Sequence, residues 1–233
     1  MSRTNEFGQP IGDPLDGWTP PPFPPRATLL GRTVTLEPLG VHHVDGLWVA
    51  LGDAPRSLWT YMAVGPFEAR DDLAAWIAVF ARDDQLAPYA VVVDGDPVGL
   101  LTYLRIEPAM GCIEIGSIIY SPALQRTTAA TETIHLLIAH AFETGYRRVE
   151  WKCDDLNAPS RSSAERFGFT YEGTFRQAVH YKDRNRDTAW YSITDREWPA
   201  LDRAFYDWLA PGNFGVDGSQ RRSLGELRSV HTD

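Results

Sequence analysis

The chain has 233 residues, of which 43% are hydrophobic and 12% aromatic, enough to bury the core of one domain with tails. Its formal net charge of −9 opposes non-specific binding to nucleic acid and mildly favours cationic amine partners. Apolar runs stay below the roughly 18 residues of a membrane span, and the N-terminus lacks a signal-peptide core. These features predict a cytoplasmic protein that does not bind membranes.

The cysteine and histidine positions bear on metal binding. Cys112 and Cys153 both lie in strand-like runs and belong to no CxxC or Cys/His pattern. Two isolated thiols are typical of a reduced protein without a structural metal. His42 and His43 are adjacent, which is not the spacing of a helical ligand pair. We therefore predict no metal.

The first half of the chain follows a proline-rich N-terminal arm, residues 1–27, that contains the run TPPPFPPR and no apolar period. Hydrophobic spacing predicts a strand within 29–39 and helices over 41–51 and 73–80. An Asp-Gly pair at 94–95 predicts a hairpin of 90–93 with 98–105. A strand over 112–120, a helix that starts between 125 and 128 and a strand over 148–153 predict one parallel crossover.

The second half predicts a short helix over 157–167, closed by Gly168 as a C-terminal cap. Strands over 169–175 and 187–193 follow, and then a helix over 198–209. Residues 211–233 are expected to be a polar C-terminal tail, so the domain is 28–210. The predicted fold class is α/β, with a mixed, mostly antiparallel central sheet, one parallel crossover and flanking helices.

The turn that leads into the central helix is rich in small and hydroxyl residues, and reads SPALQRTTAAT over 121–131. A helix start offers unpaired backbone N–H groups and the positive end of the helix dipole. Ala129 and Ala130 place no bulk in front of these groups. The turn is therefore predicted to bind a pyrophosphate.

This turn, the element order and the later run NAPSRSSAERFGFTYEGTFR together resemble the GCN5-related N-acetyltransferase (GNAT) family, and within it the RimJ/RimL-like branch, over residues 29–209. The resemblance implies a sheet with a splayed strand at the crossover, and acetyl-CoA as cosubstrate. The family's coenzyme-A motif, Q/R-x-x-G-x-G/A, is matched by Gln125, Arg126, Thr127, Thr128, Ala129 and Ala130, with Thr131 next.

Two departures from the family pattern occur near this motif. Thr128 replaces the first glycine, which a helical position tolerates because it needs no positive φ. One extra residue between Gly116 and Gln125 predicts a bulge that splays the strand. By resemblance, the splay leaves backbone groups of Ile118, Ile119 and Tyr120 free to bind the pantetheine arm.

The resemblance also implies catalytic residues on the later motif. Asn157 matches the residue that contacts the pantetheine or a site water, and Ser160 matches the serine that protonates the thiolate in the RimL branch. The tyrosine acid of other members would fall at Ala164. Val179 stands where the branch has a glutamate, and His180 next to it points the opposite way on a strand.

The general base is predicted from strand alternation. Glu114 lies between Ile113 and Ile115 and faces opposite to them, so it can point toward an amine that must lose a proton. An exposed strand carboxylate is the alternative, and Glu150 is a second candidate. For Asn157 and Ser160 the alternative is a helix cap.

The expected function is acetyl transfer from acetyl-CoA to a primary amine by direct attack. The acceptor would be a small molecule, an amino acid, an antibiotic-like amine or a peptide. Two alternatives stay open: a protein N-terminal acetyltransferase of RimJ/RimL type, which Val179 disfavours, and a non-catalytic acyl-CoA-binding sensor. The oligomeric state stays open too, with a homodimer as one option.

Overall fold

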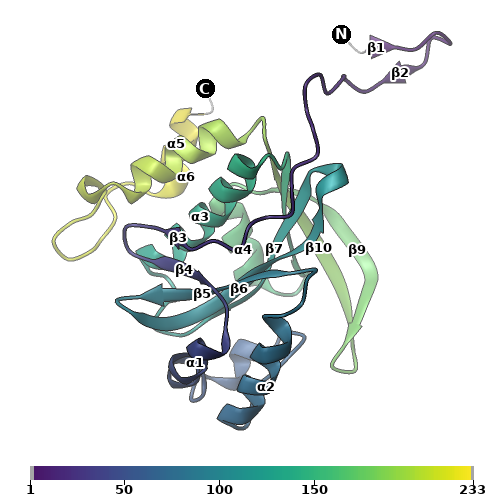
Figure 1. The fold of residues 1–233 in the computed structure, drawn as a ribbon. Helices are drawn as coiled ribbons and strands as arrows, with labels where there is room; N and C mark the ends of the chain where they lie inside the picture. Colours follow the sequence, from purple (N-terminus) through teal and green to yellow (C-terminus); the bar gives the residue numbers. More distant parts are fainter. Residues whose placement is uncertain (1–2, 232–233) are drawn as a thin grey trace.

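The computed structural model describes residues 3–231 of the chain. An eight-stranded sheet with the order β3-β4-β5-β6-β7-β8-β10-β9 forms its centre. Helices α1 (Val44–Leu51) and α2 (Arg70–Phe80) cover one face of this sheet, which we call the α1/α2 face (Figure 1). The other face carries α3 (Thr128–Thr144), α4 (Ala158–Phe167), α5 (Trp198–Leu209) and α6 (Leu224–His231).

The strands of this sheet are β3 (Leu29–Leu30), β4 (Thr35–Pro38), β5 (Ala87–Val93), β6 (Asp96–Glu107), β7 (Cys112–Tyr120), β8 (Arg148–Asp154), β9 (Thr170–Tyr181) and β10 (Arg184–Thr194). Short 3-10 helices are η1 (Val41–His43), η2 (Arg56–Trp59), η3 (Pro108–Met110) and η4 (Pro211–Asn213). Neighbouring strands pair antiparallel, except that β7 and β8 are parallel and connected through α3. The predicted fold class is confirmed.

A bulge in β7 divides its side chains between the two cores. Ile113 and Ile115 are buried in the main core under α3, whereas Ile119 belongs to the smaller core under α1 and α2. Between the pairs Leu100↔Ile119 and Thr102↔Gly116, β7 holds one residue more than β6. Ser117 lies in this interval with a φ of +49°. An extra residue reverses the alternation of side chains, so the predicted bulge is confirmed.

The N-terminal arm has two parts. Strands β1 (Arg3–Thr4) and β2 (Pro10–Ile11) form a small hairpin that projects away from the domain (Figure 1). From Trp18 onward the arm packs on the domain. The Trp18 indole donates to the Gly145 carbonyl at 3.4 Å, and the Tyr146 hydroxyl donates to the Pro22 carbonyl at 3.1 Å. Only the projecting hairpin is therefore independent of the folded core.

The C-terminal segment differs from the polar tail expected from its sequence. Helix α6 packs against α5, and Leu224 and Leu227 are buried in the main core. Two leucines three residues apart in a polar segment are too short a pattern to predict a packed helix. A domain that ended at residue 210, as the sequence suggests, would leave out α6, although α6 contributes to the main core. No helix within residues 3–231 has the length and apolar character needed to cross a membrane.

Candidate active site

The parallel strands β7 and β8 diverge soon after they begin. They pair only at Cys112↔Arg148, Ile113↔Val149 and Glu114↔Glu150. Beyond Glu114, residues 115–120 of β7 and 151–154 of β8 are unpaired with each other, and we call this region the splay. The bulge at Ser117 lies inside it. Backbone groups of residues 118–120 that point toward β8 have no partner on that strand, so they can bind an extended ligand chain.

The turn predicted to bind a pyrophosphate lies between the end of β7 and the start of α3. Helix α3 begins at Thr128, and Thr127 caps it, because its Oγ1 accepts from the Ala130 N–H at 3.1 Å. The first N–H groups of a helix have no intrahelical acceptor, which leaves those of Thr128 and Ala129 directed out of the helix end. Gln125 ties the turn to β7, since its Nε2 donates to the Tyr120 carbonyl at 2.9 Å.

One cation near this turn was missed by the sequence reasoning. Arg166 of α4 donates from Nη1 to the hydroxyl of Thr131, one turn into α3, at 3.1 Å. Burial lowers the pKa of the Arg166 guanidinium below its usual value. The contact places positive charge close to the helix start. No pattern in the sequence predicts this contact, because Arg166 and Thr131 lie on different helices and meet only in the folded structure.

Ser160 and Asn157 occupy different roles at the start of α4. Asn157 is the N-cap, and its Oδ1 accepts from the Ser160 N–H at 3.2 Å. The Ser160 hydroxyl accepts from the indole Nε1 of Trp151 at 3.0 Å. Burial raises the pKa of the Cys153 thiol, and the neighbouring Ser160 hydroxyl partly offsets this. The structure therefore assigns the cap to Asn157, and the Ser160 hydroxyl lies between the Trp151 indole and the Cys153 thiol.

Glu114 lies where the splay begins, between two cations. Its side chain is 3% exposed, and Oε2 lies 2.5 Å from Nη1 of Arg105 and 3.0 Å from Nζ of Lys152. The Lys152 ammonium is also 3.6 Å from the centre of the Trp190 ring. Glu114 thus faces away from the main core, as strand alternation predicts, but it is buried in an ion-pair network rather than free. Lys152 was not predicted to be part of this site, but alternation along β8 places its side chain on the same face of the sheet as Glu114.

Glu150 extends this network on β8. Its Oε2 lies 2.7 Å from Nζ of Lys152, and its Oε1 lies 2.7 Å from Nε of Arg148. Burial alone would raise the pKa of Glu150, but hydrogen bonds from Lys152 and Arg148 outweigh it and lower the pKa below its usual 4.5. Arg148 also pairs with Glu172 of β9 at 2.5 Å. Glu150 is therefore held as an ionised structural partner.

The β9–β10 hairpin reaches over the α1/α2 face to the loop that precedes α2. The Lys182 ammonium donates to the carbonyls of Trp59 and Gly65 at 2.9 and 2.7 Å, and Arg184 donates to the carbonyl of Thr60 at 2.6 Å. Further back on the hairpin, the side chain of Val179 is half-buried and His180 is exposed. These bonds tie the hairpin tip to the 59–65 loop.

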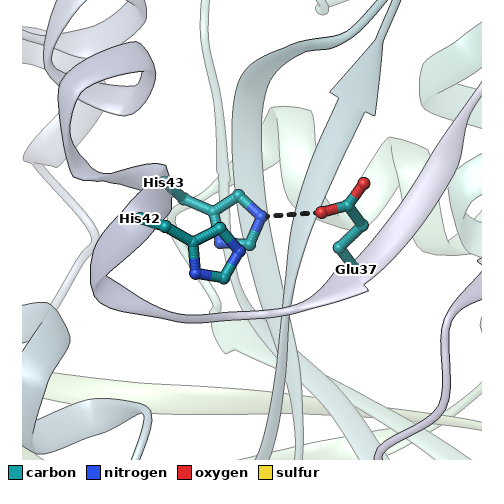
Figure 2. A group of neighbouring side chains, drawn as sticks. All are labelled: Glu37, His42 and His43. Carbon is teal, nitrogen blue, oxygen red and sulfur yellow. Dashed lines mark hydrogen bonds and ion pairs between the residues drawn. The ribbon is translucent and has the colours of Figure 1, made fainter.

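A group of possible metal ligands lies outside this region. Glu37, His42 and His43 each offer a ligand atom within 4.8 Å of the others (Figure 2). His43 Nδ1 accepts from the Gly40 N–H at 3.1 Å, so its Nε2 carries the proton, and Nε2 lies 3.1 Å from Glu37 Oε2. Both ring nitrogens of His43 are thus used in connecting β4 to α1. This arrangement favours a structural role over metal binding.

Residues 33–170 match the family model of the acetyltransferase (GNAT) domain. This chain belongs to the GNAT acetyltransferase family. A GCN5-related N-acetyltransferase from Brucella melitensis has 43% sequence identity and a TM-score of 0.90, over 92% of this chain and 100% of that chain. No curated protein matches this chain by sequence.

Two further solved structures are similar to this GNAT acetyltransferase. A probable acetyltransferase of the GNAT family from Chromobacterium violaceum has 42% identity and a TM-score of 0.77, over 82% of this chain and 98% of that one. The microcin C7 self-immunity acetyltransferase MccE, solved with acetyl-CoA and AMP, has 21% identity and a TM-score of 0.64, over 70% of this chain and 93% of that one, which shows the fold alone. The chain is an acetyl-CoA-dependent N-acetyltransferase.

Proposed function

We propose that this enzyme transfers the acetyl group of acetyl-CoA directly to a primary amine of a small molecule, amino acid or antibiotic-like compound. The observation that carries the proposal is the splay, which begins at Glu114↔Glu150 and ends beside the open start of α3. A free strand edge next to free helix N–H groups fits an extended pantetheine arm that ends in a pyrophosphate. When bound, acetyl-CoA supplies an activated thioester.

The turn and the β7 edge are the proposed cosubstrate site. The N–H groups of Thr128 and Ala129 would bind the pyrophosphate, with Gln125, Arg126, Thr127, Ala130 and Thr131 shaping the turn. Backbone groups of Ile118, Ile119 and Tyr120 would bind the pantetheine arm, and Asn157 would contact its far end. Backbone N–H groups of the splayed strand would also polarise the thioester carbonyl.

Ser160 is the proposed acid. Because its oxygen accepts from Trp151 Nε1, the hydroxyl proton points away from the indole and can pass to the departing thiolate. The start of α4 adds the positive end of a helix dipole, which favours an anion there. Ala164, which is fully buried, stands at the position where other members of the family have a tyrosine acid.

The proposed base is Glu114, and Asp154 is a second candidate. The Glu114 carboxylate is already paired with Arg105 and Lys152. An amine could therefore give its proton to Glu114 only by displacing one of these cations or through a bridging water. Within the described part of the chain, Asp154 at the open end of the splay has only neutral hydrogen-bond partners for its carboxylate, the Tyr181 hydroxyl at 2.7 Å and the Leu156 N–H at 2.9 Å. The rate–pH profiles of Glu114→Gln and Asp154→Asn would identify the base, because its loss removes the acidic limb.

The function is tested by thiol release from acetyl-CoA across a panel of small amines, amino acids and N-terminal peptides. Release that depends on a small amine, with the acetylated amine found by mass spectrometry, is the expected result. Release only with N-terminal peptides would instead support a protein N-terminal acetyltransferase. Binding of acetyl-CoA by calorimetry without release for any acceptor would contradict catalysis and support a sensor.

A further inference from the structure

Arg186 of β10 is a half-buried cation that forms no hydrogen bond or ion pair within residues 3–231. Its Nε atom is buried and makes no hydrogen bond, and no carboxylate among residues 3–231 lies within ion-pair distance of its guanidinium. Nearby arginines differ, since Arg161 lies 2.8 Å from Asp155 and Arg184 donates to Thr60. Burying a charge without a partner costs free energy, so a bound ligand is the natural source of the missing anion.

The face of β10 that carries Arg186 has two more unsatisfied donors. Side chains at 186, 188 and 190 point to the same side of a strand. The ring of Trp190 contacts the Lys152 ammonium, which places this side on the α1/α2 face. Thr188 is only 4% exposed and its Oγ1 has no partner, and Nε1 of Trp190 is likewise buried and unpartnered. Three successive side chains on one strand face thus have donors for which residues 3–231 provide no acceptor.

A carboxylate lies opposite this row on the neighbouring strand. Asp154 of β8 pairs in register with Thr188 and is 5% exposed. Its two oxygens accept one hydrogen bond each, from Tyr181 and Leu156, although a carboxylate can accept about four. Arg186 precedes Thr188 by two positions, about 7 Å along β10 between the Cα atoms, so Arg186 and Asp154 are diagonal neighbours on the two strands. They form no ion pair with each other.

We propose that Arg186 binds an oxyanion of the acceptor, so that this enzyme acetylates amines that also carry a carboxylate or a phosphate. The proposal rests on the acetyl transfer proposed above and specifies its substrate class. The guanidinium presents N–H groups in a planar fork that matches two oxygens of either anion. Thr188 and Trp190 add neutral donors, and Asp154 faces the ammonium end of the same molecule. The hairpin tip held by Lys182 encloses it.

The test compares matched acceptors that differ only in the anion. Amino acids are measured against their carboxamides, and O-phosphoethanolamine against ethanolamine, by thiol release with wild type and Arg186→Gln. We expect kcat/KM of the anionic acceptors to fall about 10- to 100-fold in Arg186→Gln, and that of the neutral acceptors to stay within about threefold. Arg186→Lys keeps the charge without the fork and should lose less. Arg176→Gln, an exposed arginine of β9, is the control for net charge.

Three results decide the outcome. A preference for amino acids or for the phosphate that Arg186→Gln removes would support the proposal and name the anion. Equal turnover of anionic and neutral acceptors by wild type would overturn it while leaving acetyl transfer intact. A weaker affinity for acetyl-CoA in Arg186→Gln, with unchanged acceptor preference, would overturn it by assigning Arg186 to the cosubstrate site. Thermal unfolding confirms that each variant is folded, and failure to acetylate any amine would instead reject the proposed function.

Discussion

The indole Nε1 of Trp151 donates a hydrogen bond to the hydroxyl oxygen of Ser160, with 3.0 Å between the two atoms. Trp151 is buried in the main core on β8, and Ser160 lies in the first turn of α4. The bond fixes the serine oxygen as an acceptor, so its proton must be donated elsewhere. A rigid core residue thus orients the proposed acid, and the helix cap does not depend on it.

Ser160→Ala should lower kcat on the order of 10²-fold while leaving acetyl-CoA affinity nearly unchanged, because it removes a proton donor and no binding group. The melting temperature should fall modestly, because the variant keeps the Asn157 cap but leaves the buried Trp151 Nε1 without its acceptor. The control is Asn157→Ala, which removes the cap and should cost about 1 kcal/mol of stability. Wild-type turnover in Ser160→Ala would show that the serine is structural. Steady-state kinetics and thermal unfolding on both variants separate these results.

Thr128→Glu should abolish acetyl-CoA binding by placing a carboxylate at the proposed pyrophosphate site. The variant should remain folded, because an acidic side chain in the first turn favours the helix dipole. Thr128→Ala is the matched control and should bind as wild type does, since the backbone N–H groups are unchanged. Calorimetry measures both affinities, and equal binding by the glutamate variant would remove this turn from the site.

Glu150→Gln should reduce stability at neutral pH by about 1–3 kcal/mol, because it removes a buried charged partner of Lys152 and Arg148. The folded pKa of Glu150 lies below its usual 4.5, so the stabilisation is complete above that pH and is lost as the pH falls through the folded pKa. The difference in free energy of unfolding between wild type and variant should therefore shrink below about pH 4.5. Urea unfolding from pH 7 to pH 3 measures it.

Glu68→Gln is the control for this pH dependence. Glu68 pairs with Arg56 at 2.7 Å, but both side chains are 70% exposed. A surface pair of this kind contributes little to stability, so the variant should follow wild type at every pH. If Glu150→Gln also followed wild type at every pH, the ion pairs of Glu150 with Lys152 and Arg148 would contribute nothing measurable to stability.

Lys182→Met should raise the KM of the amine roughly 10-fold and leave the acetyl-CoA dissociation constant unchanged. Its ammonium donates to carbonyls of the 59–65 loop, and these bonds hold the hairpin tip over the α1/α2 face. The neighbouring exposed Asp183, changed to Asn, is the control. An unchanged KM in Lys182→Met would show that the hairpin does not enclose the acceptor.

Removing residues 1–16 should leave the melting temperature and far-UV spectrum unchanged, because the hairpin in this segment projects from the domain. Removing residues 1–22 also deletes Trp18 and the buried Pro21, and should lower the melting temperature. The comparison tests whether the whole arm is a tail, as its sequence predicts, or whether its second half belongs to the fold. Equal melting temperatures for both deletions would favour the tail.

Local patterns in the sequence predicted the fold class and several local features around the proposed cosubstrate site. The spacing of apolar residues predicted the central helix, the alternation in 112–120 predicted which way Glu114 points, and the extra residue after Gly116 predicted the bulge now seen at Ser117. Each of these depends on neighbours in the chain, since periodicity and bulges are properties of a single element. The assignments of Ser160, Glu114 and the turn residues to catalysis and binding remain predictions.

The tertiary structure decided what could not be read along the chain. The register of the strands places Lys152 and Arg105 beside Glu114. The pairing of β10 with β8 places Thr188 opposite Asp154, with Arg186 two positions away. Helix α6 joined the core through Leu224 and Leu227, because α5 offered these side chains a buried surface. Charge pairing, burial and the absence of a partner for Arg186 arise between elements far apart in sequence. Propensity and pattern describe one element at a time, so these relationships appeared only once the sheet was assembled.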